Sequence, residues 1–178
     1  LLAIANRPTF DPNEYDRSST DVRRNRAITD MYEPGSVFKI VAASGALNEG
    51  VVTPDSTFFC ENGKWNYGVK TLRDVHAYGT LTMEQVIIKS SNIGTVKMAL
   101  KMKRDQLQDY IRGFGFGALT GVDMKGEAPG YTRPPSQWSK TSPYNIPMGQ
   151  EVMVTSLQMA TAMSVIANGG YLVKPYIV

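Results

Sequence analysis

Two short runs of the chain place a nucleophile, a base and an amide at the ends of predicted helices. The first run is Ser36-Val37-Phe38-Lys39, which follows the sharp turn predicted for Glu33-Pro34-Gly35. A serine hydroxyl becomes a good nucleophile only when a base removes its proton. On a helix, a lysine three residues later lies about one turn away, at a rise of ~4.5 Å, on the same face. The spacing therefore predicts acyl transfer with Ser36 as nucleophile and Lys39 as general base.

Lys39 acts as a base only in its neutral form, so its surroundings must lower its pKa. A free lysine has a pKa of about 10.4, and a value of about 7 to 8 requires roughly 4 kcal/mol from the environment. Burial has this effect. The apolar residues Val37, Ile40 and Val41 indicate a mostly buried helix that begins near Ser36. A serine three residues before a lysine occurs about once by chance in such a chain, so the prediction rests on this buried helix start. The free N–H groups of a helix start also favour an oxyanion.

The second run is Ser90-Ser91-Asn92, between two predicted helices. In this place the Ser90 hydroxyl can pass a proton between Lys39 and a leaving amine. The Asn92 amide offers a donor and an acceptor, which suits a peptide group of a substrate. By itself the run is more typical of an ordinary helix break, where serine and asparagine act as caps. Together with the first run, and in this order, it predicts a proton relay and a substrate-binding amide.

The composition is that of an ordinary folded domain. The chain has 178 residues, of which 42% are hydrophobic and 20% are charged, so it can bury a sizeable core and is unlike a disordered chain. The formal net charge of +3 is too small to indicate binding to nucleic acid. The cluster of Arg23, Arg24 and Arg26 is flanked by Asp21 and Asp30, as expected for a solvated surface loop.

The single cysteine and the single histidine, Cys60 and His76, leave little room for other chemistry. One cysteine excludes an intrachain disulfide, and one residue of each type cannot build a Cys/His metal site. Neither lies in a recognisable catalytic context, so we interpret both as structural and expect no metal and no cofactor. No apolar stretch approaches the length of a membrane span, about 18 residues, and no signal peptide is visible.

Apolar residues at helical spacing, together with cap residues, predict the helices. Thr82 and Gln85 predict a capping box, and Asn168-Gly169-Gly170 predicts a helix end in left-handed backbone. The predicted helices cover about residues 36–47, 82–89, 93–100, 107–111 and 155–166.

The remaining segments predict a mixed α and β domain with an inserted helical region. Residues 51–80 predict short strands and turns, whereas 6–30 and 118–147 read as loops. The apolar runs 1–5 and 171–178 predict strands that are entered or left midway. We therefore interpret residues 1–178 as one domain, cut from a longer protein at both ends.

The two runs resemble the signature of the penicillin-binding proteins, in which S-x-x-K and an S-D-N-type motif accompany K-T-G. The resemblance covers nearly the whole chain and is strongest to the class B, monofunctional transpeptidases of cell division, elongation or sporulation. It implies the α+β fold shared with serine β-lactamases, with a helical subdomain and an antiparallel sheet. The matching runs are Asn25-Arg26-Ala27, Glu33 to Lys39, Lys89 to Gly94, Phe114 to Gly117, Thr120 to Asp123, Gly126-Glu127 and Gly149-Gln150.

The resemblance implies a peptidoglycan D,D-transpeptidase. Ser36 attacks the carbonyl between the two terminal D-alanines of a stem peptide, and Lys39 is the general base. Ser90 relays the proton to the departing D-alanine, while Asn92 binds the donor peptide. An amine of a neighbouring stem peptide resolves the acyl-enzyme, and a β-lactam acylates the same serine. The family further implies partner proteins of wall synthesis or division, and a place on the outer face of the bacterial cytoplasmic membrane, anchored by a segment outside this chain.

The third motif of the family, lysine-threonine-glycine on a strand, belongs beyond Gly149-Gln150 and has no match there. Lys140-Thr141-Ser142 comes too early, has serine in place of glycine and precedes Pro143, so we interpret it as a loop. The family's strand supplies a carboxylate-binding hydroxyl, a cation and the second oxyanion N–H. Loss of one oxyanion donor costs roughly 10²–10³ in rate. We therefore expect a fold incomplete at its C-terminal end, and poor acylation by the 178 residues alone.

Three alternatives stay open at this point. A serine β-lactamase needs an element that activates water, and its penicillin adduct turns over within seconds. A β-lactam sensor or scaffold domain binds without turnover and is fused to a signalling membrane segment. An unrelated helical binding module carries both runs by accident, and Ser36→Ala would leave its labelling by fluorescent penicillin unchanged.

Overall fold

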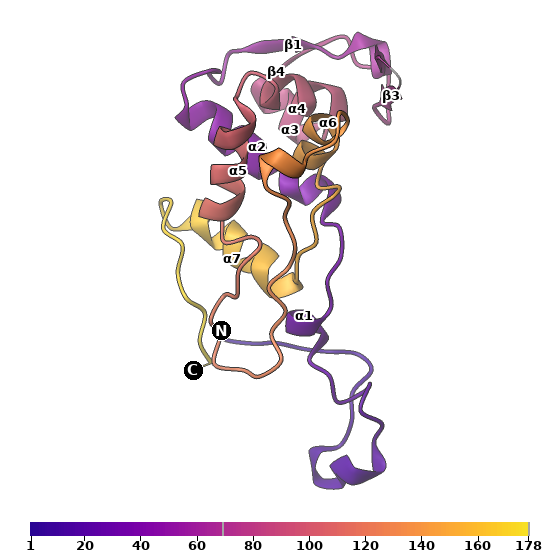
Figure 1. Cartoon of the computed structure of the whole chain (residues 1–178), viewed down its shortest axis with the longest axis vertical. Coiled ribbons are helices and arrows are strands. Elements are labelled where there is room, and N and C mark those ends of the chain that lie inside the picture. The colour runs from indigo at the N-terminus through magenta and orange to yellow at the C-terminus, as the bar shows by residue number, and fades with distance from the viewer. Residues whose placement is uncertain (69, 178) are drawn as a thin grey trace. The chain divides into compact units, whose positions relative to one another are not determined.

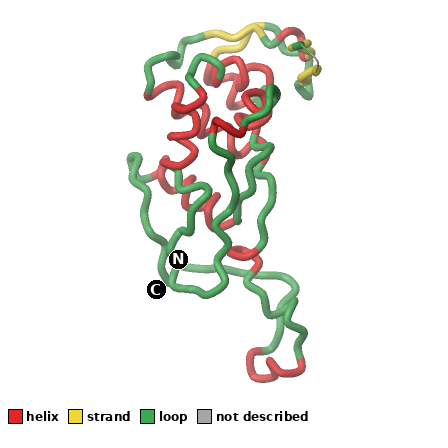
Figure 2. The backbone as a smooth tube through the Cα atoms, in the orientation of Figure 1, coloured by secondary structure: helices red, strands yellow, loops and turns green. Residues whose placement is uncertain are grey.

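Short helices and strands alternate with long connections in the computed structural model, which describes residues 1–68 and 70–177 (Figure 1, Figure 2). The α-helices are α1 (Arg26–Thr29), α2 (Lys39–Asn48), α3 (Met83–Ile88), α4 (Asn92–Ala99), α5 (Arg104–Gly113), α6 (Ser142–Asn145) and α7 (Ser156–Ala167). The strands are β1 (Thr57–Phe59), β2 (Lys64–Tyr67), β3 (Lys70–Arg73) and β4 (Thr80–Thr82). The 3₁₀ helices are η1 (Pro12–Arg17), η2 (Gly35–Phe38), η3 (Glu61–Gly63), η4 (Pro135–Gln137) and η5 (Ile146–Met148).

The chain divides into two compact units, and each is described by itself. The helical unit consists of Glu33–Arg112 and Arg133–Val152. The terminal unit consists of Leu1–Tyr32, Gly113–Thr132 and Met153–Val178. All four predicted site residues belong to the helical unit.

Helices α2, α3 and α4 form the core of the helical unit, where they lie together in Figure 1. Helix α2 buries Val41 and Ala46, and α4 buries Ile93 and Val96, all with no exposed surface. Burial of such side chains contributes roughly 1.5–3 kcal/mol each for the larger ones. This packing gives Lys39, at the start of α2, a buried position.

Two antiparallel strand pairs flank these helices. Strands β1 and β4 pair so that Phe58 faces Leu81, and both side chains are buried. Strand β4 leads directly into α3. Strands β2 and β3 form a hairpin in which Trp65 faces Leu72. The hairpin carries its aromatic and polar side chains toward the predicted site.

The terminal unit is built around α1 and α7, which contact each other. Its core contains Ile28, Val122 and Leu157. Gln158 is buried in α7 and binds two loop carbonyls, because its Nε2 donates to Ala118 at 2.8 Å and to Pro129 at 2.9 Å. One side chain of α7 thus holds two points of the long connection that the sequence predicts as a loop over residues 118–147.

The five predicted helices are confirmed as elements, although the first begins as the 3₁₀ helix η2, and α1 and α6 are short helices in segments predicted as loops. The agreement is sharpest where a capping box marks the start. Gln85 N donates to Thr82 Oγ1 at 3.2 Å, and Thr82 N donates to Gln85 Oε1 at 3.0 Å. Thr155 and Gln158 form the same pair of bonds at α7. Gly169 follows α7 with a φ of 82°, the left-handed backbone predicted there.

The two terminal strand predictions are wrong. Residues 1–5 and 171–177 have no regular secondary structure, and residue 178 lies outside the described residues. Leu2 is 98% exposed instead of buried. A strand exists only when a neighbour accepts its backbone hydrogen bonds. These segments meet through the Leu1 ammonium and the Tyr176 carbonyl at 2.5 Å, and no β-ladder joins them within the described residues.

A glycine in α4 permits close packing against α3, and its substitution tests this contact. A Cβ at Gly94 would lie 2.5 Å from Val86 Cγ2, so Gly94→Ala should lower the free energy of unfolding by about 1–3 kcal/mol. Gly79→Ala is the control, because a Cβ there meets nothing closer than 3.9 Å. Urea unfolding followed by fluorescence of Trp65 and Trp138 measures both. Equal stabilities of the two variants would contradict the packing argument.

Candidate active site

The predicted nucleophile and base are separated by one tight turn. Ser36 lies in η2, and the Lys39 N–H donates to the Ser36 carbonyl. The prediction of an α-helical start is corrected here, because the first turn is 3₁₀ and α2 begins at Lys39. Residues i and i+3 eclipse each other on a 3₁₀ helix. The Ser36 side chain is exposed, whereas Lys39 is only 2% exposed.

The Lys39 ammonium is held by Ser90, 51 positions later. Nζ donates to the Ser90 carbonyl oxygen at 2.6 Å and lies 3.0 Å from the Ser90 Oγ. Burial lowers the pKa of Lys39 to about 8, and the negative charge of Asp74 opposes this effect. Such a lysine is partly neutral near physiological pH and can accept a proton. No Ser36 Oγ–Lys39 Nζ hydrogen bond is present among the described residues.

Ser90 has a strained backbone that directs it to Lys39. Its φ is 53°, in the left-handed region that costs an ordinary residue about 1–2 kcal/mol. The bonds Ser90 N to Ile87 O and Ser91 N to Val86 O close the end of α3 as a Schellman motif. Glycine is the usual residue at this position. A serine here supplies a hydroxyl at a cost in stability, as is common at functional sites.

Asp74 organises the second run and was not identified from the sequence. Its carboxylate accepts from the Ser91 hydroxyl at 2.6 Å, from Asn92 N at 2.6 Å and from Ile93 N at 3.0 Å. The first N–H groups of a helix lack partners within it, and a carboxylate there is favoured by the helix dipole. Asp74 therefore positions the start of α4 and the residue that follows Ser90.

Asn92 connects α4 to the hairpin. Its Nδ2 donates to the Arg73 carbonyl at 2.9 Å, so the amide group is oriented by β3. The Nδ2 group, which the sequence analysis offers to a substrate, therefore binds the protein itself. Oδ1 is the atom of the Asn92 amide that can accept a hydrogen bond from a ligand.

A cavity of about 420 Å³ contains both Ser36 and Asn92 in its lining. The hairpin and the segment after α6 complete its wall, so it lies between elements far apart in the sequence. Tyr67 stacks on Tyr144 with ring centroids 3.9 Å apart, which braces the hairpin against α6. The other lining residues are Gly35, Tyr67, Lys70, Thr71, Leu72, Asn145, Met148 and Gln150.

Two glycines meet directly beside the nucleophile. Gly35 N donates to the Gly149 carbonyl at 3.1 Å. Gly149 ends η5 with a φ of 78°, and a Cβ there would lie 2.2 Å from the Gly35 oxygen. Only glycine permits this approach, so the turn that presents Ser36 is seated on the turn at Gly149.

The structure brings the predicted residues together as two connected pairs. Lys39 and Ser90 are joined by hydrogen bonds, and Ser36 and Asn92 share one cavity. Cys60 is fully buried, and burial raises the pKa of its thiol, which is the opposite of an activated nucleophile. The arrangement suits acyl transfer through Ser36, with a buried lysine and a hydroxyl as proton carriers.

Comparison with known proteins agrees with this chemistry. A family profile described as penicillin binding protein transpeptidase domain matches residues 1–178. The chain is 38% identical to penicillin-binding protein PbpB of Mycobacterium tuberculosis, over all of the chain and 26% of that relative. It is 35% identical to the peptidoglycan D,D-transpeptidase FtsI of Escherichia coli, over 96% of the chain and 29% of that relative. The chain therefore spans less than a third of either relative's length.

A solved structure shows the same fold. Penicillin-binding protein 3 from Mycobacterium tuberculosis, complexed with aztreonam, has a TM-score of 0.81 and 38% identity, over 86% of this chain and 35% of that one. The predicted mixed α+β architecture is confirmed by this likeness.

The strain at Ser90 can be separated from the role of its hydroxyl. Ser90→Gly should raise the free energy of unfolding by about 1 kcal/mol, because glycine adopts a φ of 53° without strain. Ser90→Ala loses the hydroxyl and keeps the strain. Both should slow acylation by a fluorescent β-lactam roughly 10²-fold if the hydroxyl relays a proton. Equal stability of the two variants would contradict the strain, and wild-type acylation rates would contradict the relay.

The pKa of Lys39 predicts the pH dependence of acylation. Below a pH of about 8 the amine is mainly protonated and cannot accept a proton, so the rate should rise through about pH 8 and then level off. The negative Asp74 favours the protonated amine, so Asp74→Asn should move the midpoint to lower pH. Asp55→Asn, at an exposed turn, should leave the midpoint unchanged. Stopped-flow acylation across pH measures all three proteins, and a higher midpoint for Asp74→Asn would overturn the assignment.

Proposed function

This chain belongs to the penicillin-binding protein transpeptidase family, and from that premise we propose that it carries the acyl-transfer site of a class B peptidoglycan D,D-transpeptidase. Residues 1–178 are proposed as one transpeptidase domain. The substrates are stem peptides that end in D-Ala-D-Ala. A neighbouring stem-peptide amine is the acceptor. β-Lactam antibiotics are proposed as ligands of the same serine.

The proposed reaction begins when the Ser36 oxygen attacks the carbonyl carbon between the two D-alanines. Lys39 accepts the hydroxyl proton, and Ser90 passes a proton to the departing D-alanine nitrogen as the C–N bond breaks. The acceptor amine then attacks the ester carbon, its proton returns through the same groups, and Ser36 is released as a hydroxyl. Asn92 orients the donor peptide through Oδ1. Atoms and charges balance in both halves.

The contact between the buried Lys39 and Ser90 is the observation that carries the proposal. A lysine that is 2% exposed, with a pKa lowered to about 8, is costly to a fold unless it has a chemical use. The Lys39 Nζ lies 3.0 Å from the Oγ of Ser90, the serine that we propose as the proton relay.

The cavity around Ser36 also supports transfer over hydrolysis. A β-lactamase requires a group that activates water for deacylation. None of the described residues that line the cavity is an aspartate or a glutamate. We therefore propose a long-lived β-lactam adduct. For the same reason a serine β-lactamase is not favoured as a second function.

Partners and location follow from the family as proposals. We propose assembly with proteins of cell-wall synthesis or division, and a position on the outer face of the bacterial cytoplasmic membrane. Within the described residues, no helix is long and apolar enough to cross a bilayer.

Labelling with a fluorescent penicillin tests the nucleophile in a protein that also includes the family's K-T-G strand, because the 178 residues alone are expected to acylate poorly. Ser36→Ala should abolish the covalent label, because the exposed Ser36 hydroxyl lies one turn before the buried Lys39 and lines the cavity. Ser164→Ala, on an exposed position of α7, should label as the wild type does. The label should persist for many minutes after the free reagent is removed. Equal labelling of Ser36→Ala would overturn the site, and release within seconds would identify a hydrolase.

A further inference from the structure

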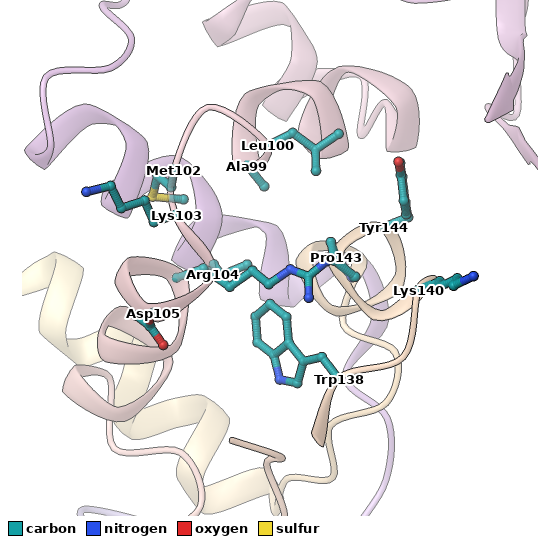
Figure 3. A pocket seen from close by; sticks show the side chains of 11 residues that line it. Ala99, Leu100, Met102, Lys103, Arg104, Asp105, Trp138, Lys140, Pro143 and Tyr144 are labelled. Carbon is teal, nitrogen blue, oxygen red and sulfur yellow. The ribbon is translucent and has the colours of Figure 1, made fainter. Parts of the chain in front are cut away.

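A second pocket of the helical unit shares no lining residue with the cavity at Ser36. Its volume is about 540 Å³. It lies between the turn that leads into α5 and the segment from Trp138 to Tyr144 (Figure 3). We call it the basic pocket, because Lys103, Arg104 and Lys140 are part of its lining.

The floor of the basic pocket is apolar. Met102, Leu107, Trp138 and Pro143 line it and are buried. The indole Nε1 of Trp138 already donates to the Arg133 carbonyl at 2.9 Å. The ring therefore offers a ligand its hydrocarbon surface, because its one polar group is satisfied within the protein.

The rim of the pocket is cationic and exposed. Figure 3 shows Arg104 extended across the pocket toward Trp138 and Pro143, with Lys103 and Lys140 on opposite sides of it. Asp105 also lines the pocket, and Figure 3 shows its carboxylate apart from the Arg104 guanidinium. Across residues 1–68 and 70–177, no carboxylate lies within ion-pair distance of these three cations.

Some basic residues elsewhere in the described chain do form ion pairs. Arg24 and Arg26 share the carboxylates of Asp21 and Asp30. Lys97 pairs with Glu61. Three cations and one carboxylate, Asp105, line this pocket, and none of the three cations forms an ion pair in the described residues, so the concave site has a net positive potential.

We propose that the basic pocket docks an acidic segment of a partner protein. One apolar side chain of that segment packs on the floor, and its carboxylates bind the rim. A guanidinium binds a carboxylate through two parallel hydrogen bonds, which suits Arg104 at the centre. A buried apolar centre inside a polar rim is the usual anatomy of a protein interface.

A protein segment fits this pocket better than a nucleic acid or a phosphate polymer does. Three cations neutralise few phosphates, and such polymers have no aliphatic group for a floor of Leu107 and Trp138. The proposal goes beyond acyl transfer and is independent of Ser36, because the two pockets have separate linings.

A peptide array tests the proposal with the purified chain. The probes are 12-residue peptides in which one leucine, phenylalanine or tryptophan is flanked by two to four aspartates or glutamates. Matched peptides carry asparagine and glutamine instead. We expect the acidic set to bind and the amide set not to bind, and binding should weaken as salt rises from about 0.01 M to about 1 M, since the screening length falls from ~30 to ~3 Å.

Charge reversal at the rim locates the binding. Arg104→Glu should weaken the best acidic peptide by about tenfold or more, and Lys140→Glu should also weaken it. Arg112→Glu reverses an exposed charge at the other end of α5 and should change binding less than about twofold. Thermal unfolding and the fluorescent penicillin label of Ser36 should match the wild type in all three variants.

Several results would overturn the proposal. These are an array without any bound acidic peptide, equal binding of the amide set, and equal weakening by Arg112→Glu and Arg104→Glu. Stronger binding of inorganic polyphosphate than of every peptide, lost in Arg104→Glu, would assign the pocket to a phosphate polymer and would also reject it. If the wild-type protein binds acidic peptides but is not labelled by fluorescent penicillin, acyl transfer at Ser36 is rejected and this docking surface is still supported.

Discussion

A lysine ammonium that is almost wholly removed from water needs acceptors close by, and Lys39 finds two of them on Ser90. Without these acceptors, burial of the Lys39 charge would lower the stability of the helical unit. The same burial lowers the pKa of the amine to about 8, so a minor fraction of it is neutral at physiological pH. The fold and the chemistry therefore depend on one contact, which joins the first turn of α2 to the junction of α3 and α4.

That contact imposes conditions on its surroundings. Ser90 must end α3 in a left-handed conformation that glycine would adopt more readily. Asp74 must then complete the start of α4, where two backbone N–H groups and the Ser91 hydroxyl converge on one carboxylate. Since Asp74 follows β3 directly, the hairpin and the helices are connected next to the contact between Ser90 and Lys39.

Sequence reasoning succeeded where a structural relation is local. The spacing of Ser36 and Lys39, and the capping box at Thr82, are relations within four residues, so residue type and order suffice to predict them. The strands expected at both termini depended on partners that no local pattern specifies, and they were wrong. Asp74 escaped notice for the same reason, because its value comes from a hairpin that places it beside Ser91, 17 residues later. The predicted roles of Ser36, Lys39, Ser90 and Asn92 stay predictions until they are tested by substitution.

The approach of Gly149 to Gly35 also bears on how this site can evolve. A side chain at Gly149 would clash with the backbone of Gly35. A substitution at Gly149 therefore also requires the backbone at Gly35 to move. Variation beneath the serine is therefore limited by a contact between two backbones. Elsewhere the same cavity is lined by side chains, among them those of Tyr67, Lys70 and Thr71, so its shape there is set by residue type.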